Sequence, residues 1–187
     1  MDKKIIFLDL DGTLTNDEKK ITPKTKEALM DIQKRGHIVA LASGRPTPGM
    51  GFIAKELELE KYGGYVMSFN GGKIIDWKTK ETVFENTLDR KYLPDLIRYA
   101  RQNNLGLITY DNKQGLVATR VDPYVMLETV KINRIPAFLT DVVKYVDYNP
   151  NKFLYTVDPE ISEYHEKRLA EKFGDVLSVY RSTDYFI

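Results

Sequence analysis

Two carboxylates stand two positions apart near the start of the chain, where an apolar run over residues 5–8 ends at Asp9 and Asp11. On an extended backbone, residues i and i+2 point to the same side, so strand geometry would bring these two side chains together. Carboxylates held that close repel each other unless a cation lies near them or one of them keeps its proton. The pair therefore predicts a nearby cation or a retained proton.

A second polar group follows the next apolar run, residues 38–42, where Ser43 leads into Gly44 and Arg45. Taken alone, this is an ordinary turn between a strand and a helix. Ser43, however, stands at the carboxyl end of the second predicted strand, and Asp9 stands at the carboxyl end of the first. Both would face one crevice if the two strands are parallel neighbours. The guanidinium of Arg45 is well suited to binding phosphate.

Asn70 and Gly71 follow a third apolar run, residues 65–69. Asn-Gly is the strongest short signal for a β-hairpin, so a simple turn is one interpretation of this dipeptide. Its place after the third strand makes a position beside the same crevice the other interpretation. The two interpretations are compatible.

The elements that must position these groups are short apolar strands separated by helices. Apolar runs of this length, bounded by turn signals, are typical of strands buried on both faces of a parallel sheet. Thr22 followed by Pro23 predicts the start of a helix that ends at Gly36, and a second helix is predicted over residues 51–59. Three strands joined by two helical crossovers predict a right-handed, doubly wound sheet.

After residue 72 the pattern changes to an α+β unit with an antiparallel sheet. The predicted elements are a hairpin of residues 73–77 and 82–85, helices over 89–103, 124–130 and 159–173, and strands over 107–110, 116–119, 153–157, 176–180 and 185–187. A turn is predicted over residues 111–115, and residues 131–147 receive no clear assignment.

The composition excludes several classes of protein. The chain has 187 residues, 42% of them hydrophobic, and a net charge of +1, which gives no electrostatic reason to expect a nucleic acid or an anionic membrane as partner. Cysteine is absent, so disulfides and thiolate metal sites are excluded. No apolar segment has the length of a signal peptide core or a membrane span, and a cytoplasmic location is expected.

The seven residues from Asp9 to Thr15, Asp-Leu-Asp-Gly-Thr-Leu-Thr, directly follow a predicted strand. The aspartates could merely cap the strand end and its turn. In this position, however, the run resembles the first motif of the haloacid dehalogenase-like hydrolases over its whole length. Ser43-Gly44-Arg45 is similar to the second motif in the form typical of the Cof-type phosphatases.

The resemblance implies an α/β fold, with a Rossmann-like parallel sheet core and an inserted α+β cap domain. Residues 1–80 would form the N-terminal part of the catalytic core, and residues 81–187 the cap that governs substrate specificity. The implied activity is a magnesium-dependent phosphatase acting on small phosphorylated metabolites such as sugar phosphates. Phosphomutases share this chemistry and are a close variant.

The resemblance also implies a role for each residue of the motifs. Asp9 would be the nucleophile that forms an aspartyl phosphate, and Asp11 the general acid and base. Mg2+ would be held by the side chain of Asp9, the backbone carbonyl of Asp11 and an aspartate of a later motif. The residues implied in phosphate or substrate binding are Gly12, Thr13, Ser43, Gly44, Arg45, Asn70 and Gly71.

The later motifs of the family, a lysine and a Gly-Asp beyond the cap, have no counterpart before the chain ends at Ile187. In the family's strand order the first strand is central, so here it would become an edge strand that invites self-association. We therefore expect a partial version of a longer phosphatase or, less readily, a chain completed by a partner. The alternative function is a non-catalytic module that binds a phosphorylated ligand.

Overall fold

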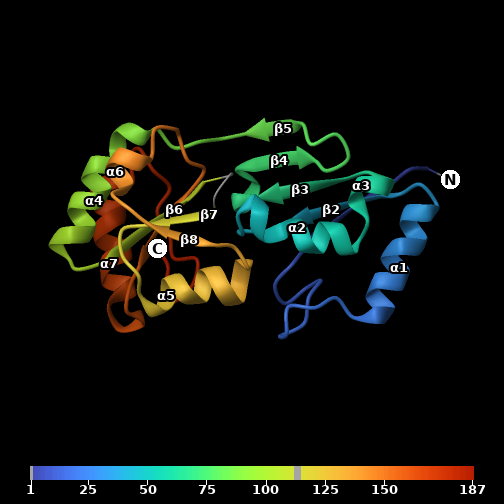
Figure 1. The fold of residues 1–187 in the computed structure, drawn as a ribbon, viewed down its shortest axis with the longest axis horizontal. Helices are drawn as coiled ribbons and strands as arrows, with labels where there is room; N and C mark the ends of the chain where they lie inside the picture. Colours follow the sequence, from blue (N-terminus) through green and yellow to red (C-terminus); the bar gives the residue numbers. More distant parts are fainter. Residues whose placement is uncertain (1, 112–114) are drawn as a thin grey trace. The chain divides into compact units, whose positions relative to one another are not determined.

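The computed structural model describes residues 2–111 and 115–187, so the predicted turn over residues 111–115 falls mostly outside the described residues. The chain divides into two compact units, Met1–Asn86 and Thr87–Ile187. Each unit has a sheet of its own (Figure 1). We describe each unit by itself.

The first unit contains a five-stranded sheet in the order β1-β2-β3-β4-β5. Its strands are β1 (Ile5–Asp9), β2 (Ile38–Ala42), β3 (Gly64–Ser68), β4 (Lys73–Asp76) and β5 (Thr82–Glu85). The first three strands are parallel neighbours, as predicted, and β4 and β5 extend the sheet in antiparallel fashion. Because β5 pairs with β4, this unit continues to Asn86, past the boundary predicted after residue 80.

Local signals determine where the helices of this unit begin and end. Helix α1 (Pro23–Lys34) starts where predicted, and the Thr22 hydroxyl accepts a hydrogen bond from the Thr25 N–H. The second predicted helix, 51–59, is wrong in its bounds: α2 (Thr47–Glu56) starts earlier, with a proline in its first turn, and α3 (Leu59–Tyr62) follows separately. Glu58, at φ 51°, breaks the helix between them.

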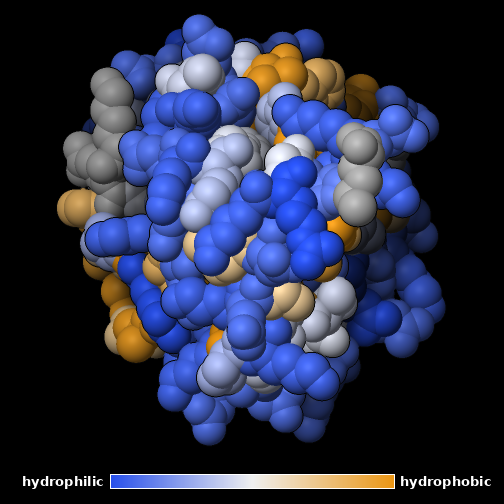
Figure 2. Space-filling model, turned by 90° about the vertical axis from the view of Figure 1, so that its right-hand side faces the viewer, coloured by the Kyte–Doolittle hydropathy of each residue, from blue (hydrophilic) through white to orange (hydrophobic). Residues whose placement is uncertain are grey.

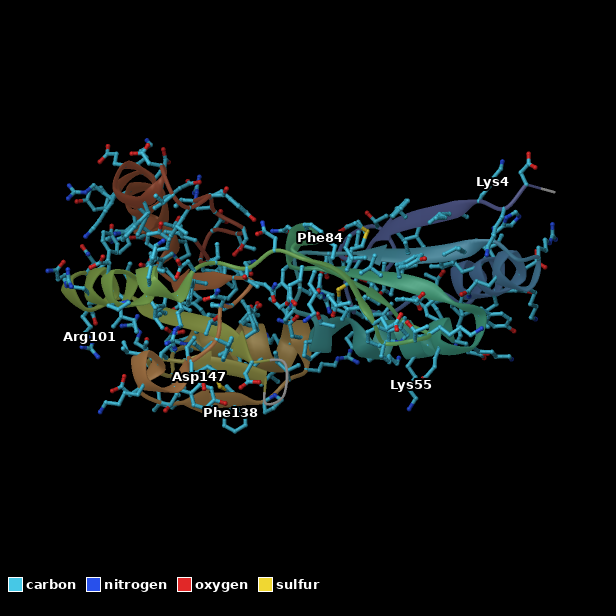
Figure 3. The ribbon with its side chains drawn as sticks, turned by 90° about the horizontal axis from the view of Figure 1, so that it is seen from above. Lys4, Lys55, Phe84, Arg101, Phe138 and Asp147 are labelled. Atoms are coloured by element: carbon cyan, nitrogen blue, oxygen red, sulfur yellow. The ribbon has the colours of Figure 1, made fainter. Side chains whose placement is uncertain are left out.

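The helices of the first unit pack on one face of its sheet. That face carries Val39, Leu41 and Val66, all fully buried in one hydrophobic cluster with residues of α1, α2 and α3. In Figure 3, α2, marked by Lys55, lies on one side of the strands. These contacts supply the main apolar burial that holds the parallel strands and their helices together.

The opposite face of β1 is open, which corrects the prediction that this strand is buried on both faces. Ile5 is 48% exposed and Phe7 is 61% exposed. The physical reason is the position of β1 at the edge of the sheet, with no described helix of this unit packed over these two residues.

Figure 2 shows a mostly hydrophilic face of the molecule on which hydrophobic residues gather in separate patches.

The second unit contains a four-stranded sheet in the order β8-β7-β6-β9. The strands are β6 (Gly106–Asp111), β7 (Gly115–Ala118), β8 (Ala137–Leu139) and β9 (Phe153–Thr156). The predicted antiparallel sheet is observed for β6 with β7 and β9, whereas β8 runs parallel to β7.

Helices cover the sheet of the second unit, and its main core lies under α4 and α7. The helical elements are η2 (Arg90–Tyr92), α4 (Leu93–Gln102), α5 (Pro123–Met126), a π-helical turn η3 (Leu127–Asn133), α6 (Val142–Tyr145) and α7 (Pro159–Phe173). Among the described residues, no helix combines the length and the apolar character needed to cross a membrane.

The predicted final strands are wrong as regular elements. Residues 176–180 form no strand, and residues 185–187 take part only in isolated bridges. The backbone of Ile187 nevertheless pairs with Tyr155, through N–H to carbonyl distances of 2.8 and 3.2 Å. The end of the chain thus lies beside β9 without adding a full strand to the sheet.

Candidate active site

The loop after β1 is held in place by its own backbone and by two leucines. The Leu14 N–H donates to the Asp9 carbonyl at 3.1 Å, and the Thr15 N–H donates to the Leu10 carbonyl at 2.9 Å. Leu10 and Leu14 are buried in the core of the first unit. Gly12, at φ 80°, makes the turn between them. The alternation of buried leucines with polar residues leaves Asp9 and Asp11 exposed at the carboxyl end of the strand.

Asp11 is bound by two cationic side chains. Arg45 donates through Nε to Oδ2 at 2.9 Å and through Nη2 to Oδ1 at 2.6 Å. Lys19 donates through Nζ to Oδ1 at 2.7 Å. The Arg45 side chain is only 4% exposed, so the bidentate pair fixes a buried guanidinium at the mouth of the loop.

These contacts set the ionisation of Asp11. Partial burial acts to raise the pKa of the Asp11 carboxyl, but the hydrogen bonds and positive charges of Arg45 and Lys19 outweigh it, and the net pKa lies below its ordinary value. Asp11 is therefore ionised at neutral pH in this arrangement. A proton on this carboxyl requires that at least one of the two cations be drawn away.

The second and third predicted groups lie together. Ser43 follows β2 directly, and the pairing of Asp9 with Ala42 places Ser43 one residue beyond the end of β1. The Asn70 N–H donates to the Ser43 carbonyl at 3.0 Å, and the Ser43 hydroxyl accepts from the Arg45 N–H at 3.2 Å. Parallel pairing therefore brings residues from three strand ends to one edge of the sheet, as the sequence predicted.

Gly44 and the Asn70-Gly71 turn fit closely against each other. A Cβ atom on Gly44 would lie 2.6 Å from Oδ1 of Asn70, closer than real contacts allow. Asn70 (φ 55°) and Gly71 (φ 86°) both adopt left-handed backbone conformations in the connection between antiparallel β3 and β4. The hairpin interpretation is thus correct, and the same turn presents the Asn70 side chain to Gly44.

Lys19 is the contact that the sequence did not predict. It lies in a polar loop at φ 59° and carries no motif that would single it out. Thr13, predicted to bind substrate, is exposed in the same loop as Gly12. Only the folded loop shows that Lys19 reaches the carboxylate of the motif.

The oxygen ligands at this edge of the sheet make up only part of a site for a hard cation. Carboxylate and carbonyl oxygens of Asp9 and Asp11 are the ligand types that Mg2+ prefers. Within residues 2–111 and 115–187, no three His, Cys, Asp or Glu side chains form a group that could hold a metal ion. Asp9 and Asp11 thus fit as part of a magnesium site.

Comparisons with known proteins show the family of this chain. The family model of the haloacid dehalogenase-like hydrolases matches residues 6–187. A protein of Streptococcus pyogenes serotype M6, provisionally named a phosphatase, is 25% identical over 100% of this chain and 70% of its own length. YxeH of Bacillus subtilis, also provisionally named a phosphatase, is 29% identical over 93% of this chain and 70% of its own length.

A solved structure extends the agreement to the fold. The crystal structure of a haloacid dehalogenase-like hydrolase from Bacteroides thetaiotaomicron is 37% identical and superposes with a TM-score of 0.92, covering 99% of this chain and 70% of the other. The chain belongs to the haloacid dehalogenase-like hydrolases, and within them to the Cof type. Its α/β sheet with an added α+β unit is the fold of that class. The two relatives from Streptococcus pyogenes and Bacillus subtilis both carry the name phosphatase.

Proposed function

We propose that the protein is a magnesium-dependent phosphatase that hydrolyses small phosphorylated metabolites, such as sugar phosphates, through an aspartyl phosphate at Asp9. The observation that carries this proposal is the convergence of Asp9, Ser43 and the buried guanidinium of Arg45 at the ends of adjacent parallel strands. Phosphoryl transfer to a carboxylate requires a nucleophilic carboxylate with phosphate-binding groups beside it. Here the guanidinium and the serine hydroxyl can bind the phosphate. The phosphatase names of the relatives support the same class of reaction.

In the first step, a carboxylate oxygen of Asp9 attacks phosphorus, and the bond between phosphorus and the ester oxygen breaks. The leaving oxygen takes a proton from Asp11, which then accepts a proton from the water that hydrolyses the aspartyl phosphate. Inorganic phosphate and free Asp9 result. Bound Mg2+, held by the side chain of Asp9 and the backbone carbonyl of Asp11, would neutralise phosphate charge.

The ion pairs of Asp11 suggest how it obtains its proton. With Arg45 and Lys19 in place, the pKa of Asp11 is lowered and the carboxyl is ionised. A substrate phosphate competes for the same guanidinium, because Arg binds phosphate and carboxylate through the same two-donor fork. Transfer of Arg45 to the phosphate would remove much of what keeps the proton off Asp11.

The same proposal includes three further parts. Thr87–Ile187 acts as a cap that governs substrate specificity, and the protein acts in the cytoplasm. The residues that bind phosphate or substrate are Gly12, Thr13, Ser43, Gly44, Arg45, Asn70 and Gly71. The proposal also includes self-association through the open β1 edge, which the exposed Ile5 and Phe7 support.

The second candidate is a non-catalytic module that binds a phosphorylated ligand. The tight Arg45–Asp11 pair favours it, as does a partial set of metal ligands among the described residues. Such a module would use Ser43 and Arg45 for binding, and its Asp9 would carry out no chemistry.

Phosphate release by the purified protein distinguishes the two candidates. We expect magnesium-dependent release from a panel of sugar phosphates, loss of release in Asp9→Asn, and unchanged release in Asp17→Asn. Asp17 is a matched control because it is an exposed aspartate in the following loop with no partner among the described residues. Equal activity of the wild type and Asp9→Asn would refute the nucleophile, and phosphate binding without release would favour the binding module.

A further inference from the structure

The second unit contains a half-open hollow of about 320 Å³ that takes no part in the proposed phosphatase chemistry. It lies between the last turns of α4, the end of β7 and the start of α6. Its apolar floor is formed by Ile97, Leu105 and Val142, each at most 6% exposed and part of the main core of this unit. Cavities of this size accommodate small organic molecules.

Arg120 is fixed at the rim of this hollow. Its Nε donates to Oδ2 of Asp122 at 3.2 Å, and its Nη1 donates to the carbonyl and Oδ1 of Asn104 at 2.8 and 3.1 Å. Within the described parts of the chain, its Nη2 has no hydrogen-bond partner. A guanidinium oriented by three hydrogen bonds, with one nitrogen left over, is prepared to bind a ligand without further ordering.

Arg101 supplies a second guanidinium to the same lining, from the end of α4 (Figure 3). Its side chain forms no ion pair or hydrogen bond with any residue that the structure describes, whereas the side chain of Arg98, on the preceding turn, pairs with Asp95 at 2.8 Å. The acidic residue of the lining, Asp141, has its Oδ2 3.6 Å from Nζ of Lys144. Because Arg120 is paired with Asp122 and Asp141 lies near Lys144, the charge left uncompensated at the rim is the positive charge of Arg101.

We propose that this hollow binds a small organic anion, with its carboxylate between Arg101 and Arg120 and a short apolar body on the floor of Ile97, Leu105 and Val142. Arg101 can pair with the carboxylate through two parallel hydrogen bonds, which sets the orientation of the headgroup, and Arg120 can add one hydrogen bond from Nη2. The floor would remove the apolar body from water. Because every lining residue belongs to Thr87–Ile187, binding here is independent of Asp9.

Isovalerate is a suitable probe, since it joins a carboxylate to a branched four-carbon body, and neutral isovaleramide is its matched control. Nuclear magnetic resonance titration of the full chain would follow the backbone amides of the lining residues Thr119 and Thr140. We expect saturable shifts with isovalerate and affinity at least about tenfold weaker for isovaleramide, because hydrogen bonds to charged groups contribute about 1.5–3 kcal/mol. Equal binding of the acid and the amide, or no saturable shift, would overturn the proposal.

Variants separate this site from its surroundings. Arg101→Gln should weaken isovalerate binding about tenfold while leaving the unfolding temperature of the free protein unchanged, since Arg101 is exposed and unpaired among the described residues. Arg98→Gln, one turn away on α4 and outside the lining, should bind as the wild type does, and so should Asp9→Asn. Undiminished binding by Arg101→Gln would show that the anion is held elsewhere.

Discussion

Arg45 and Asp11 form a bidentate pair across 34 positions of sequence, with Nε–Oδ2 and Nη2–Oδ1 distances of 2.9 and 2.6 Å. The guanidinium is nearly buried and the carboxylate is about one-third exposed. In this pair, Asp11 binds the Arg45 guanidinium that is proposed to bind the substrate phosphate. The guanidinium also lowers the pKa of Asp11, the proposed general acid. The substrate must therefore compete with Asp11 for Arg45.

Arg45→Lys keeps the positive charge but removes the planar guanidinium, which can donate two parallel hydrogen bonds to one phosphate. We expect the KM for a sugar phosphate to rise about tenfold, because a lysine amine cannot donate two parallel hydrogen bonds to a phosphate. Steady-state kinetics of phosphate release measure this. Arg35→Lys is the matched control, since Arg35 pairs with Asp31 on the exposed surface of α1. An unchanged KM in Arg45→Lys would remove Arg45 from phosphate binding.

Gly44→Ala tests the close fit between the second and third strand ends. The new Cβ would lie 2.6 Å from Oδ1 of Asn70, so the Asn70 side chain or its turn must move. Because Asn70 is exposed and its side chain can turn away, we expect a loss of up to about 1 kcal/mol in the free energy of unfolding, measured by urea denaturation.

Gly51→Ala provides the control for that substitution. Its Cβ would meet only the Trp77 ring at 3.9 Å, and alanine favours the interior of α2, so we expect a gain of up to about 1 kcal/mol. Equal effects of the two substitutions would show that the Gly44–Asn70 contact does not constrain the site.

His165 makes the second unit sensitive to acid. Burial, and then the positive charge of Arg168, lower the pKa of His165 below its usual value near 6.5, and Tyr99 Oη lies 2.9 Å from Nδ1. The unfolded chain therefore binds a proton before the folded one does. The stability that this histidine contributes is present above about pH 6.5 and is lost as the pH falls toward the lowered pKa of the folded state.

His165→Asn removes this proton-linked contribution. We expect the thermal midpoint of the wild type to decline more than that of the variant between about pH 7.5 and pH 5.5. Differential scanning calorimetry across this interval measures the difference. Parallel declines for the two proteins would contradict the assignment.

The sequence predicted the fold where local signals decide it. Thr22 and Pro23 begin α1 because the cap and the first-turn proline act within a few residues. The parallel order of β1, β2 and β3 followed from their short apolar runs and helical connections. Asp158 and Pro159 likewise begin α7 where expected.

The sequence failed where distant contacts decide the outcome. The apolar run of β1 by itself predicted burial on both faces, whereas the missing neighbours of β1 correctly predicted an edge strand, on which Phe7 is exposed. The β8 strand, Ala137–Leu139, is too short to show a period, and it forms because β7 offers it a parallel edge. At the site, the types and spacing of Asp9, Asp11 and Ser43 were readable, but the contact of Lys19 with Asp11 was not.

The open face of β1 predicts self-association. Phe7 is 61% exposed on an edge strand, where apolar side chains and unpaired backbone groups favour contact with another chain. We expect Phe7→Thr to reduce the weight-average mass measured by light scattering. Val121→Thr, at an equally exposed position (61%) in the second unit, should leave it unchanged. A wild type that is monomeric at all concentrations would contradict this prediction.

The proposed mechanism requires that Asp9 become covalently phosphorylated. The protein is incubated with a sugar phosphate labelled in its phosphoryl group, and acid quench and peptide mapping then locate the label. We expect an acid-stable, base-labile label on the peptide that contains Asp9, and no label in Asp9→Asn. Phosphate release without label on that peptide, or label retained in Asp9→Asn, would contradict it.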